Sequence, residues 1–182
     1  MLANQSPRVI GAANRMVGER QGGHATPMTE IYVDADACPV KREVLRVAER
    51  HGLVVHMVSN GGFNTRGNPL IRSVMVPNTP DAADDWIAEH VRPGDIAVTA
   101  DIPLADRCLK ADAGALGPTG RAFTPENIGN ALATRDLLAH LRETGESKGY
   151  NPSFTPQDRT RFLQALETMV QAAMAKGDGR GG

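Results

Sequence analysis

From residue 30 onward, the sequence alternates short apolar runs with segments whose apolar residues recur at helical spacing. The apolar runs are rich in β-branched residues and are bounded by turn-forming residues, which is typical of buried strands. Strands that alternate with helices favour a parallel sheet covered on both faces. We therefore predict a three-layer α/β/α fold with a central, mainly parallel sheet and C-terminal helices. Strands are expected at 31–33, 53–58, 71–76, 95–99, 115–116 and 121–123, and helices at about 39–52, 79–91, 103–112, 124–143 and 157–175.

The pattern predicts one domain with a tail at each end. Residues 1–29 are rich in Gly, Asn, Gln and Arg and lack sustained apolar periodicity, so we interpret them as a flexible extension. Met28 stands just before the first strand and is an alternative start of the native protein. Residues 30–175 form the predicted domain, and residues 176–182 are expected to fray. A chain of 182 residues with 41% hydrophobic residues can bury one sizeable core.

Charge and cysteine content narrow the class of protein. The net charge is −1, so a nucleic-acid partner would have to be held by a local basic patch. Cys38 and Cys108 are the only cysteines, too few for a disulfide framework or a zinc cluster, and we expect a reducing, cytoplasmic setting. Cys38 precedes a helix and is interpreted as a packing residue. No apolar run reaches membrane-spanning length, so no membrane partner is expected.

Polar oxygen ligands follow each of the first four predicted strands. They are Asp34 and Asp36 after the first strand, Asn60 after the second, Asp81, Asp84 and Asp85 in the helix after the third, and Asp101 after the fourth. In a parallel sheet the carboxyl ends of the strands share one edge, and ligands bind there. Hard oxygen donors of this kind suit Mg²⁺ or Mn²⁺. The sequence therefore predicts a divalent-metal site at this edge.

Helix geometry ranks the acids of the third segment. The expected buried stripe consists of Ala83, Ile87 and Val91. Asp84 lies at the edge of this stripe and is the best ligand candidate, Asp81 is the second, and Asp85 lies nearly opposite the stripe. Two alternatives stay open: acids in a first helical turn also interact favourably with the helix dipole, and Asp36 or Asp101 could serve only as helix caps.

Three motifs in this order resemble the YaiI/YqxD family of uncharacterised bacterial proteins. They are VDADACP at 33–39, DAADDWI at 81–87 and TADIPLA at 99–105. The likeness extends through FTPENI at 123–128 and DRTRF at 158–162 and covers about residues 30–170. That family in turn is similar to PIN-like nuclease domains. This resemblance implies a strand order of 3-2-1-4-5 and an acidic cluster that binds Mg²⁺ or Mn²⁺.

The resemblance also implies roles for individual residues. Asp34 and Asp101 match the PIN aspartates at two strand ends, and Asp84 lies where a central acid is expected, so these three are the predicted catalytic residues. The predicted metal ligands are Asp34, Asp36, Asp81, Asp84, Asp85 and Asp101. Asp36 departs from the pattern, because PIN domains often carry a small polar residue there. After Asp101, Asp106 is the one obvious further acid.

The function that this resemblance implies is metal-assisted hydrolysis of phosphodiester bonds in RNA or single-stranded DNA. Lys41, Asn60, Arg66 and Arg72 are the predicted substrate contacts, because they lie in or beside the segments that follow the first two strands. Aromatic residues make up 4% of the chain, which argues against a platform for base stacking.

Two other functions stay open. The first is a module that binds a metal, RNA or a protein partner without catalysis. The second is a phosphatase similar to the haloacid dehalogenases, with Asp34 as nucleophile, Asp36 as general acid/base and Ser59 ending the next strand. Two departures weaken it: Cys38 stands where Thr or Val is expected, and the Gly94-Asp95 pair stands at the start of its predicted strand instead of following one.

Overall fold

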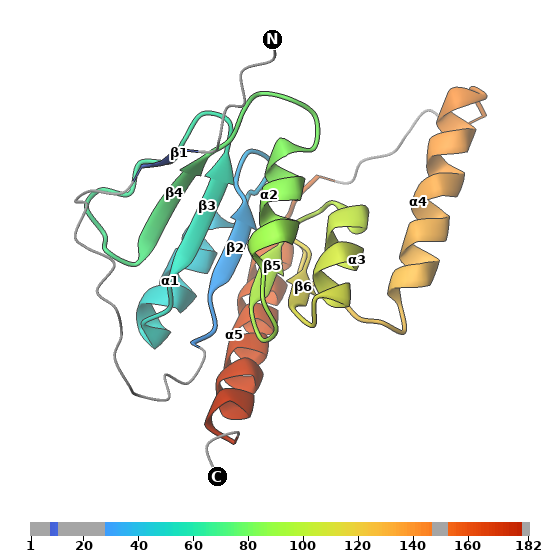
Figure 1. Cartoon of the computed structure of the whole chain (residues 1–182). Helices are drawn as coiled ribbons and strands as arrows, with labels where there is room; N and C mark the ends of the chain where they lie inside the picture. The colour runs from blue at the N-terminus through green and yellow to red at the C-terminus, as the bar shows by residue number, and fades with distance from the viewer. Residues whose placement is uncertain (1–7, 11–27, 147–152, 180–182) are drawn as a thin grey trace.

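The computed structural model describes residues 8–10, 28–146 and 153–179. It contains a sheet with helices on both faces (Figure 1). The strands in these ranges are β1 (Arg8–Ile10), β2 (Ile31–Asp34), β3 (Val55–Ser59), β4 (Ile71–Met75), β5 (Ile96–Val98), β6 (Gly114–Leu116) and β7 (Ala122–Phe123). The helices are α1 (Lys41–His51), α2 (Ala82–His90), α3 (Ile102–Lys110), α4 (Ile128–Glu143) and α5 (Pro156–Asp178). The predicted fold class is confirmed. No helix in the described ranges is long and apolar enough to cross a membrane.

The sheet has the order β1-β4-β3-β2-β5-β6-β7. The five inner strands are parallel, and β1 and β7 pair antiparallel at the two edges. Numbered along the chain, the parallel strands follow the order 3-2-1-4-5 that the resemblance implies. The chain moves outward from β2 through β3 to β4 and then crosses to β5 on the other side of β2. The carboxyl ends of β2 and β5 thus flank the point where the topology reverses, which is where such folds bind ligands.

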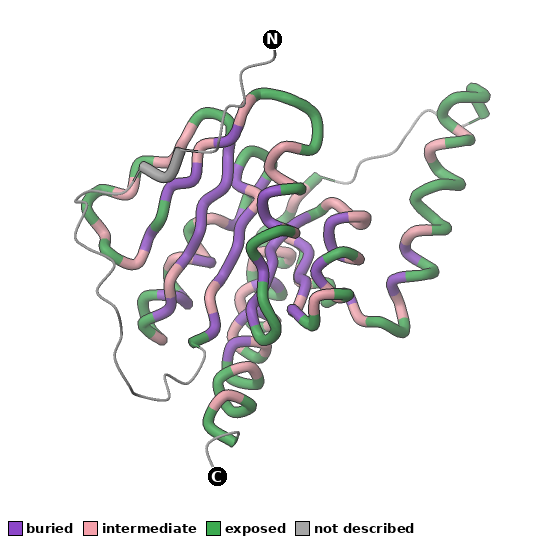
Figure 2. Tube along the Cα trace, viewed as in Figure 1, coloured by how far each residue is buried: buried purple, intermediate pink, exposed green. Residues whose placement is uncertain are grey.

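The two faces of the sheet carry separate cores. On one face, strand residues such as Val33 and Met57 pack with Val44 of α1 and Phe162 of α5. On the other face, Tyr32 and other strand residues pack against α2 and α3. Figure 2 shows that buried residues are concentrated in the sheet and that most of α4 is exposed. Because side chains alternate along a strand, Asp34 shares the face of Tyr32 and is directed toward α2 and α3.

Aromatic rings fix α2 on the sheet. Tyr32 and His56 stack on each other in the sheet, and the Trp86 ring of α2 meets them in tilted contacts, with ring centroids 6.2 Å from that of Tyr32 and 6.0 Å from that of His56. The Tyr32 hydroxyl also donates to the carbonyl oxygen of His90 at 3.3 Å. Such pairs stabilise packing beyond the area that they bury. The last turn of α2 is therefore held against β2 and β3, and this sets where its first turn lies.

The elements of the structure differ from the sequence-based predictions in four places. Part of the expected extension, residues 8–10, pairs with β4, while residues 1–7 and 11–27 lie outside the described residues. At the C-terminus, α5 continues through residues 176–178, which were expected to fray, and residues 180–182 lie outside the described residues. Helix α2 begins at Ala82 because Asp81 has a left-handed φ of 62°. In α4, helical spacing predicts that Leu137 and Leu138 supply apolar contact positions, but they are 57% and 47% exposed.

Candidate active site

Three carboxylates from separate segments converge at the carboxyl ends of β2 and β5. Asp34 ends β2, Asp84 lies in the first turn of α2, and Asp101 follows β5. Burial raises the pKa of Asp34, and the charges of Asp36 and Asp101 raise it further. Burial, with the charges of Asp101, Asp34 and Asp81, raises the pKa of Asp84 to about 6. The carboxylates therefore lie close enough together that their charges disfavour ionisation of Asp34 and Asp84.

The position of Asp101 follows from a helix cap. Its Oδ1 accepts a hydrogen bond from the Leu104 amide at 2.8 Å, and its own amide donates to Thr99 Oγ1 at 3.0 Å. Asp and Ser-like side chains are favoured at this position because they satisfy an amide of the first turn. Asp101 therefore caps α3, and the same hydrogen bonds hold its carboxylate at the edge where Asp34 lies. Asp101 can thus cap the helix and belong to the acidic site at the same time.

The three acids of the α2 segment differ in their distance from the site, in the order that helix geometry predicts. Asp84 is partly buried and interacts with Asp34 and Asp101. Asp81 is exposed but lies close enough to raise the pKa of Asp84. Asp85 is exposed and accepts a hydrogen bond from Arg107 Nη1 at 2.7 Å, so it faces α3. The structure therefore brings Asp84 and Asp81 to the site and leaves Asp85 outside it.

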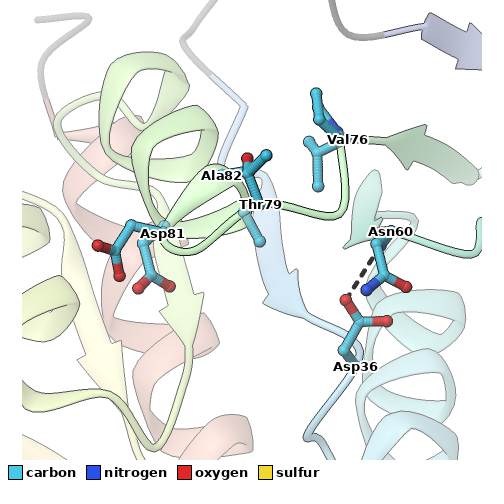
Figure 3. A pocket seen from close by; sticks show the side chains of 9 residues that line it. Asp36, Asn60, Val76, Thr79, Asp81 and Ala82 are labelled. Carbon is cyan, nitrogen blue, oxygen red and sulfur yellow. Dashed lines mark hydrogen bonds between the residues drawn. The ribbon is translucent and has the colours of Figure 1, made fainter.

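A small pocket of about 90 Å³ lies beside these acids (Figure 3). Its lining residues are Asp36, Asn60, Val76, Pro77, Thr79, Asp81, Ala82, Ala83 and Asp84. Figure 3 shows Asp36 and Asn60 on one wall and Asp81 on the opposite wall. Asp36 Oδ2 accepts a hydrogen bond from the Asn60 amide at 3.0 Å, and Asn60 Nδ2 donates to Asn78 Oδ1 at 3.0 Å. The predicted Asp36 and Asn60 thus form one side of the pocket.

Of the predicted basic contacts, the structure brings Lys41 to this edge. Its Nζ donates to the carbonyl oxygen of Ala35, and its charge lowers the pKa of Asp34. Lys41 therefore partly offsets the repulsion among the acids and adds a cation next to them.

Arg66 and Arg72 were predicted at the site, and the structure places them elsewhere. Arg72 is the second residue of β4, and its charge lowers the pKa of Glu30, which precedes β2 at the opposite end of the sheet. Arg66 lies two residues before Asn68, which bonds Glu49 near the end of α1. The reason is topological: the loop after β3 must return to the start of a parallel strand, so its later residues leave the carboxyl edge.

Within residues 8–10, 28–146 and 153–179, no group of three or more His, Cys, Asp or Glu side chains is placed to hold a metal ion. A closed cage of protein ligands is therefore not formed there. Mg²⁺ keeps several waters and commonly uses one or two carboxylates. The oxygen donors, their mutual repulsion and a pocket with room for several waters fit that open kind of site.

Three further residues, Cys38, Asp95 and Ser59, bear on the packing role of Cys38 and on the phosphatase alternative. Cys38 is 7% exposed in the core, and burial raises the pKa of its thiol, as expected for a packing residue. Asp95 precedes β5, where it accepts hydrogen bonds from the Glu30 and Arg92 amides, so the phosphatase arrangement lacks this acid at the carboxyl edge. Ser59 ends β3, and in the described part of the chain its buried Oγ has no hydrogen-bond partner.

The fold and the strand-end acids define an α/β protein with an acidic site at its topological switch point. The chain belongs to the YaiI/YqxD family, whose model, described as uncharacterised, matches residues 32–172. A UPF0178 protein of Parvibaculum lavamentivorans is 62% identical over 145 residues, covering 80% of this chain and 95% of the relative. A UPF0178 protein of Mesorhizobium japonicum is 61% identical over 148 residues, covering 81% and 96% respectively. No solved structure matches the chain.

Proposed function

We propose that the protein is a Mg²⁺- or Mn²⁺-dependent nuclease that hydrolyses phosphodiester bonds of RNA or single-stranded DNA. One observation carries the proposal: Asp34, Asp84 and Asp101 meet from three segments at the carboxyl ends of β2 and β5. Clustered like charges are costly unless a cation offsets them. Perturbed carboxylates in a hollow at a switch point are typical of functional sites, which supports the proposal.

In this proposal, the chain's own residues position the reactants. One or two of the carboxylates of Asp34, Asp84 and Asp101 would hold the cation directly, and the remaining carboxylate oxygens would bind its waters and orient the attacking one. Asp36 and Asp81 would line its hydrated side, where the pocket opens between them. Lys41 lies close to Asp34 and would attract the substrate phosphate. A bound divalent cation would polarise the phosphate and lower the pKa of water.

A second candidate is a non-catalytic module that binds RNA with the same fold. It is favoured by the absence of a three-ligand acidic or thiol shell within the described residues. Both candidates use the same edge of the sheet. They differ in whether phosphodiester bonds are broken.

The proposal is tested with a panel of substrates and metals. Purified protein is incubated with end-labelled single-stranded RNA, single-stranded DNA, their duplexes and a small phosphomonoester, in Mg²⁺, Mn²⁺ or EDTA. We expect cleavage of a single strand that requires the metal and leaves the phosphomonoester intact. Binding without cleavage under all conditions would favour the non-catalytic module. Release of phosphate from the monoester alone would favour the phosphatase.

A further inference from the structure

We propose that a strip of cations beside the acidic pocket binds the backbone of single-stranded nucleic acid and leads it to that pocket. The strip, here called the basic rim, consists of Lys41, Arg42, Arg121, Arg159 and Arg161. This inference rests on the proposed function and adds the path of the substrate. Three contacts establish the rim.

The first contact joins the rim to the pocket. Lys41 and Arg42 are the first residues of α1, and α1 begins shortly after the carboxyl end of β2. Lys41 Nζ donates a hydrogen bond to the carbonyl oxygen of Ala35, the residue that follows Asp34. The α1 end of the rim therefore lies next to a proposed metal ligand.

The second contact brings the start of α5 to the start of α1. Arg159 Nη1 donates to Glu43 Oε1 at 2.8 Å and to the Pro39 carbonyl oxygen at 3.3 Å. The guanidinium also lies 5.1 Å from the ring centroid of Phe154. Arg159 thus ties the two helix N-termini together. Two residues later, Arg161 Nη1 lies 3.6 Å from Asp158 Oδ1, and the Arg161 side chain is 67% exposed.

The third contact adds the turn between β6 and β7. Gly120 has a φ of +88°, and a Cβ there would lie 2.7 Å from the Arg161 carbonyl carbon and 2.8 Å from the Phe162 nitrogen. The backbone of the turn therefore packs directly on the first turns of α5, which only glycine permits. Arg121, the next residue, is exposed beside this contact. The turn follows β6, so it belongs to the same carboxyl edge as Asp34.

The charge of these segments favours a polyanion. Residues 39–43, 117–121 and 154–161 carry the five cations of the rim and two acids, Glu43 and Asp158. The whole chain has a net charge of −1, so this excess is local. Arginine and lysine that neutralise phosphates release counterions, and this drives binding to nucleic acid. Phe154 is the one aromatic residue in these segments, which predicts contact with the backbone and little reading of bases.

The acidic site favours a single strand over a duplex. Asp34 and Asp84 are partly buried, and the pocket beside Asp84 is about 90 Å³. A phosphate must therefore leave the rim and enter a recess to reach these carboxylates. Duplex DNA is stiff, with a persistence length of about 150 base pairs, and bends sharply only at a cost in free energy. A single strand can follow the rim and turn into the recess.

The test measures how binding depends on salt, in EDTA so that no cleavage occurs. Fluorescence anisotropy is recorded with labelled oligo(dT), oligo(U) and a DNA duplex, each of about 20 nucleotides and long enough to span such a site. The full chain is compared with the double variant Arg121→Gln/Arg161→Gln. The matched control is Arg92→Gln/Arg135→Gln, which removes two exposed arginines away from the rim. Circular dichroism checks that each variant is folded.

If both rim arginines contact phosphates, the slope of log K against log salt should become less steep by about 1.4, at about 0.7 per contact. The same relation predicts a loss of affinity of about 25-fold at about 0.1 M salt and only about 3-fold at about 0.5 M. The control should match the wild type. An unchanged slope in the rim variant, or an equal loss in the control, would overturn the inference.

The salt dependence of binding tests the rim, and metal-dependent cleavage tests the nuclease, so the two proposals can fail independently. Rim-dependent binding by a protein that cleaves nothing would support the rim and reject the nuclease. Metal-dependent cleavage with an unaltered salt slope in the rim variant would reject the rim and leave the nuclease standing. Tighter binding of a duplex than of either single strand would contradict the proposed path.

Discussion

Replacing Asp34 with asparagine is expected to lower kcat/KM for cleavage of single-stranded RNA or DNA by about a thousandfold, because metal-assisted charge stabilisation contributes several kcal/mol. Asp34 lies at the centre of the acidic site: burial raises its pKa and the charges of Asp36 and Asp101 raise it further, while its own charge adds to the burial that raises the pKa of Asp84. Asparagine keeps the shape of the side chain and removes the negative charge. The measurement is the initial rate of oligonucleotide cleavage in saturating Mn²⁺.

The control for this variant is Asp112→Asn. Asp112 is exposed, follows α3 away from the carboxyl edge and has a left-handed φ of 59°, which asparagine also tolerates. Its cleavage rate should equal that of the wild type. A rate for Asp34→Asn within about threefold of the wild type would mean that the activity comes from another site or another protein, because loss of several kcal/mol cannot leave the rate so little changed.

Replacing Asp84 with asparagine is expected to stabilise the metal-free protein at neutral pH while it abolishes cleavage. The folded-state pKa of Asp84 is about 6, above its ordinary value of 3.8. The folded state therefore favours the protonated carboxyl, and its contribution to stability is present below pH 3.8 and is lost as the pH rises through 6. Because Asp84 is only partly buried and solvent screens its charge, we expect a gain of about 1 kcal/mol for the variant at pH 7.

Urea unfolding at a series of pH values tests whether Asp84→Asn raises the free energy of unfolding at neutral pH. The difference in unfolding free energy between Asp84→Asn and the wild type should grow from near zero below pH 4 to its full value above pH 6. With Mn²⁺ present, the wild type should become more stable than Asp84→Asn, because a ligand at one hundred times its Kd stabilises the protein that binds it by about 2.7 kcal/mol. The matched control, Asp85→Asn, alters an exposed pair with Arg107 and should show neither effect. A variant less stable than the wild type at pH 7 without metal would contradict the repulsion inferred at this site.

Much of the candidate site could be predicted because two rules act locally. Parallel strands deliver their carboxyl ends to one edge, so acids that follow predicted strands, such as Asp34 and Asp101, had to lie near each other. Helical periodicity then distinguished Asp84 from Asp85 without knowledge of any partner. Both rules depend on the order of residues in single segments, and the sequence contains that information.

The remaining features depend on packing between distant segments. Arg72 lies close to the acids in the sequence, but the return of the loop to a parallel strand carries it to the opposite end of the sheet. Strand β1 is three residues long and exists through its pairing with β4. The approach of Arg161 to Gly120 requires α5 to be packed on the sheet, and no local pattern in either segment signals it.

We expect the strand-end acids to hold one divalent cation. Isothermal titration calorimetry of the wild type, Asp34→Asn, Asp101→Asn and Asp112→Asn with Mn²⁺ tests it most directly. We expect saturable binding to the wild type and to Asp112→Asn, and binding at least about tenfold weaker in the other two variants, as loss of a ligand or its support commonly causes. Absence of binding at millimolar Mn²⁺, or equal affinity in Asp34→Asn and the wild type, would contradict the claim.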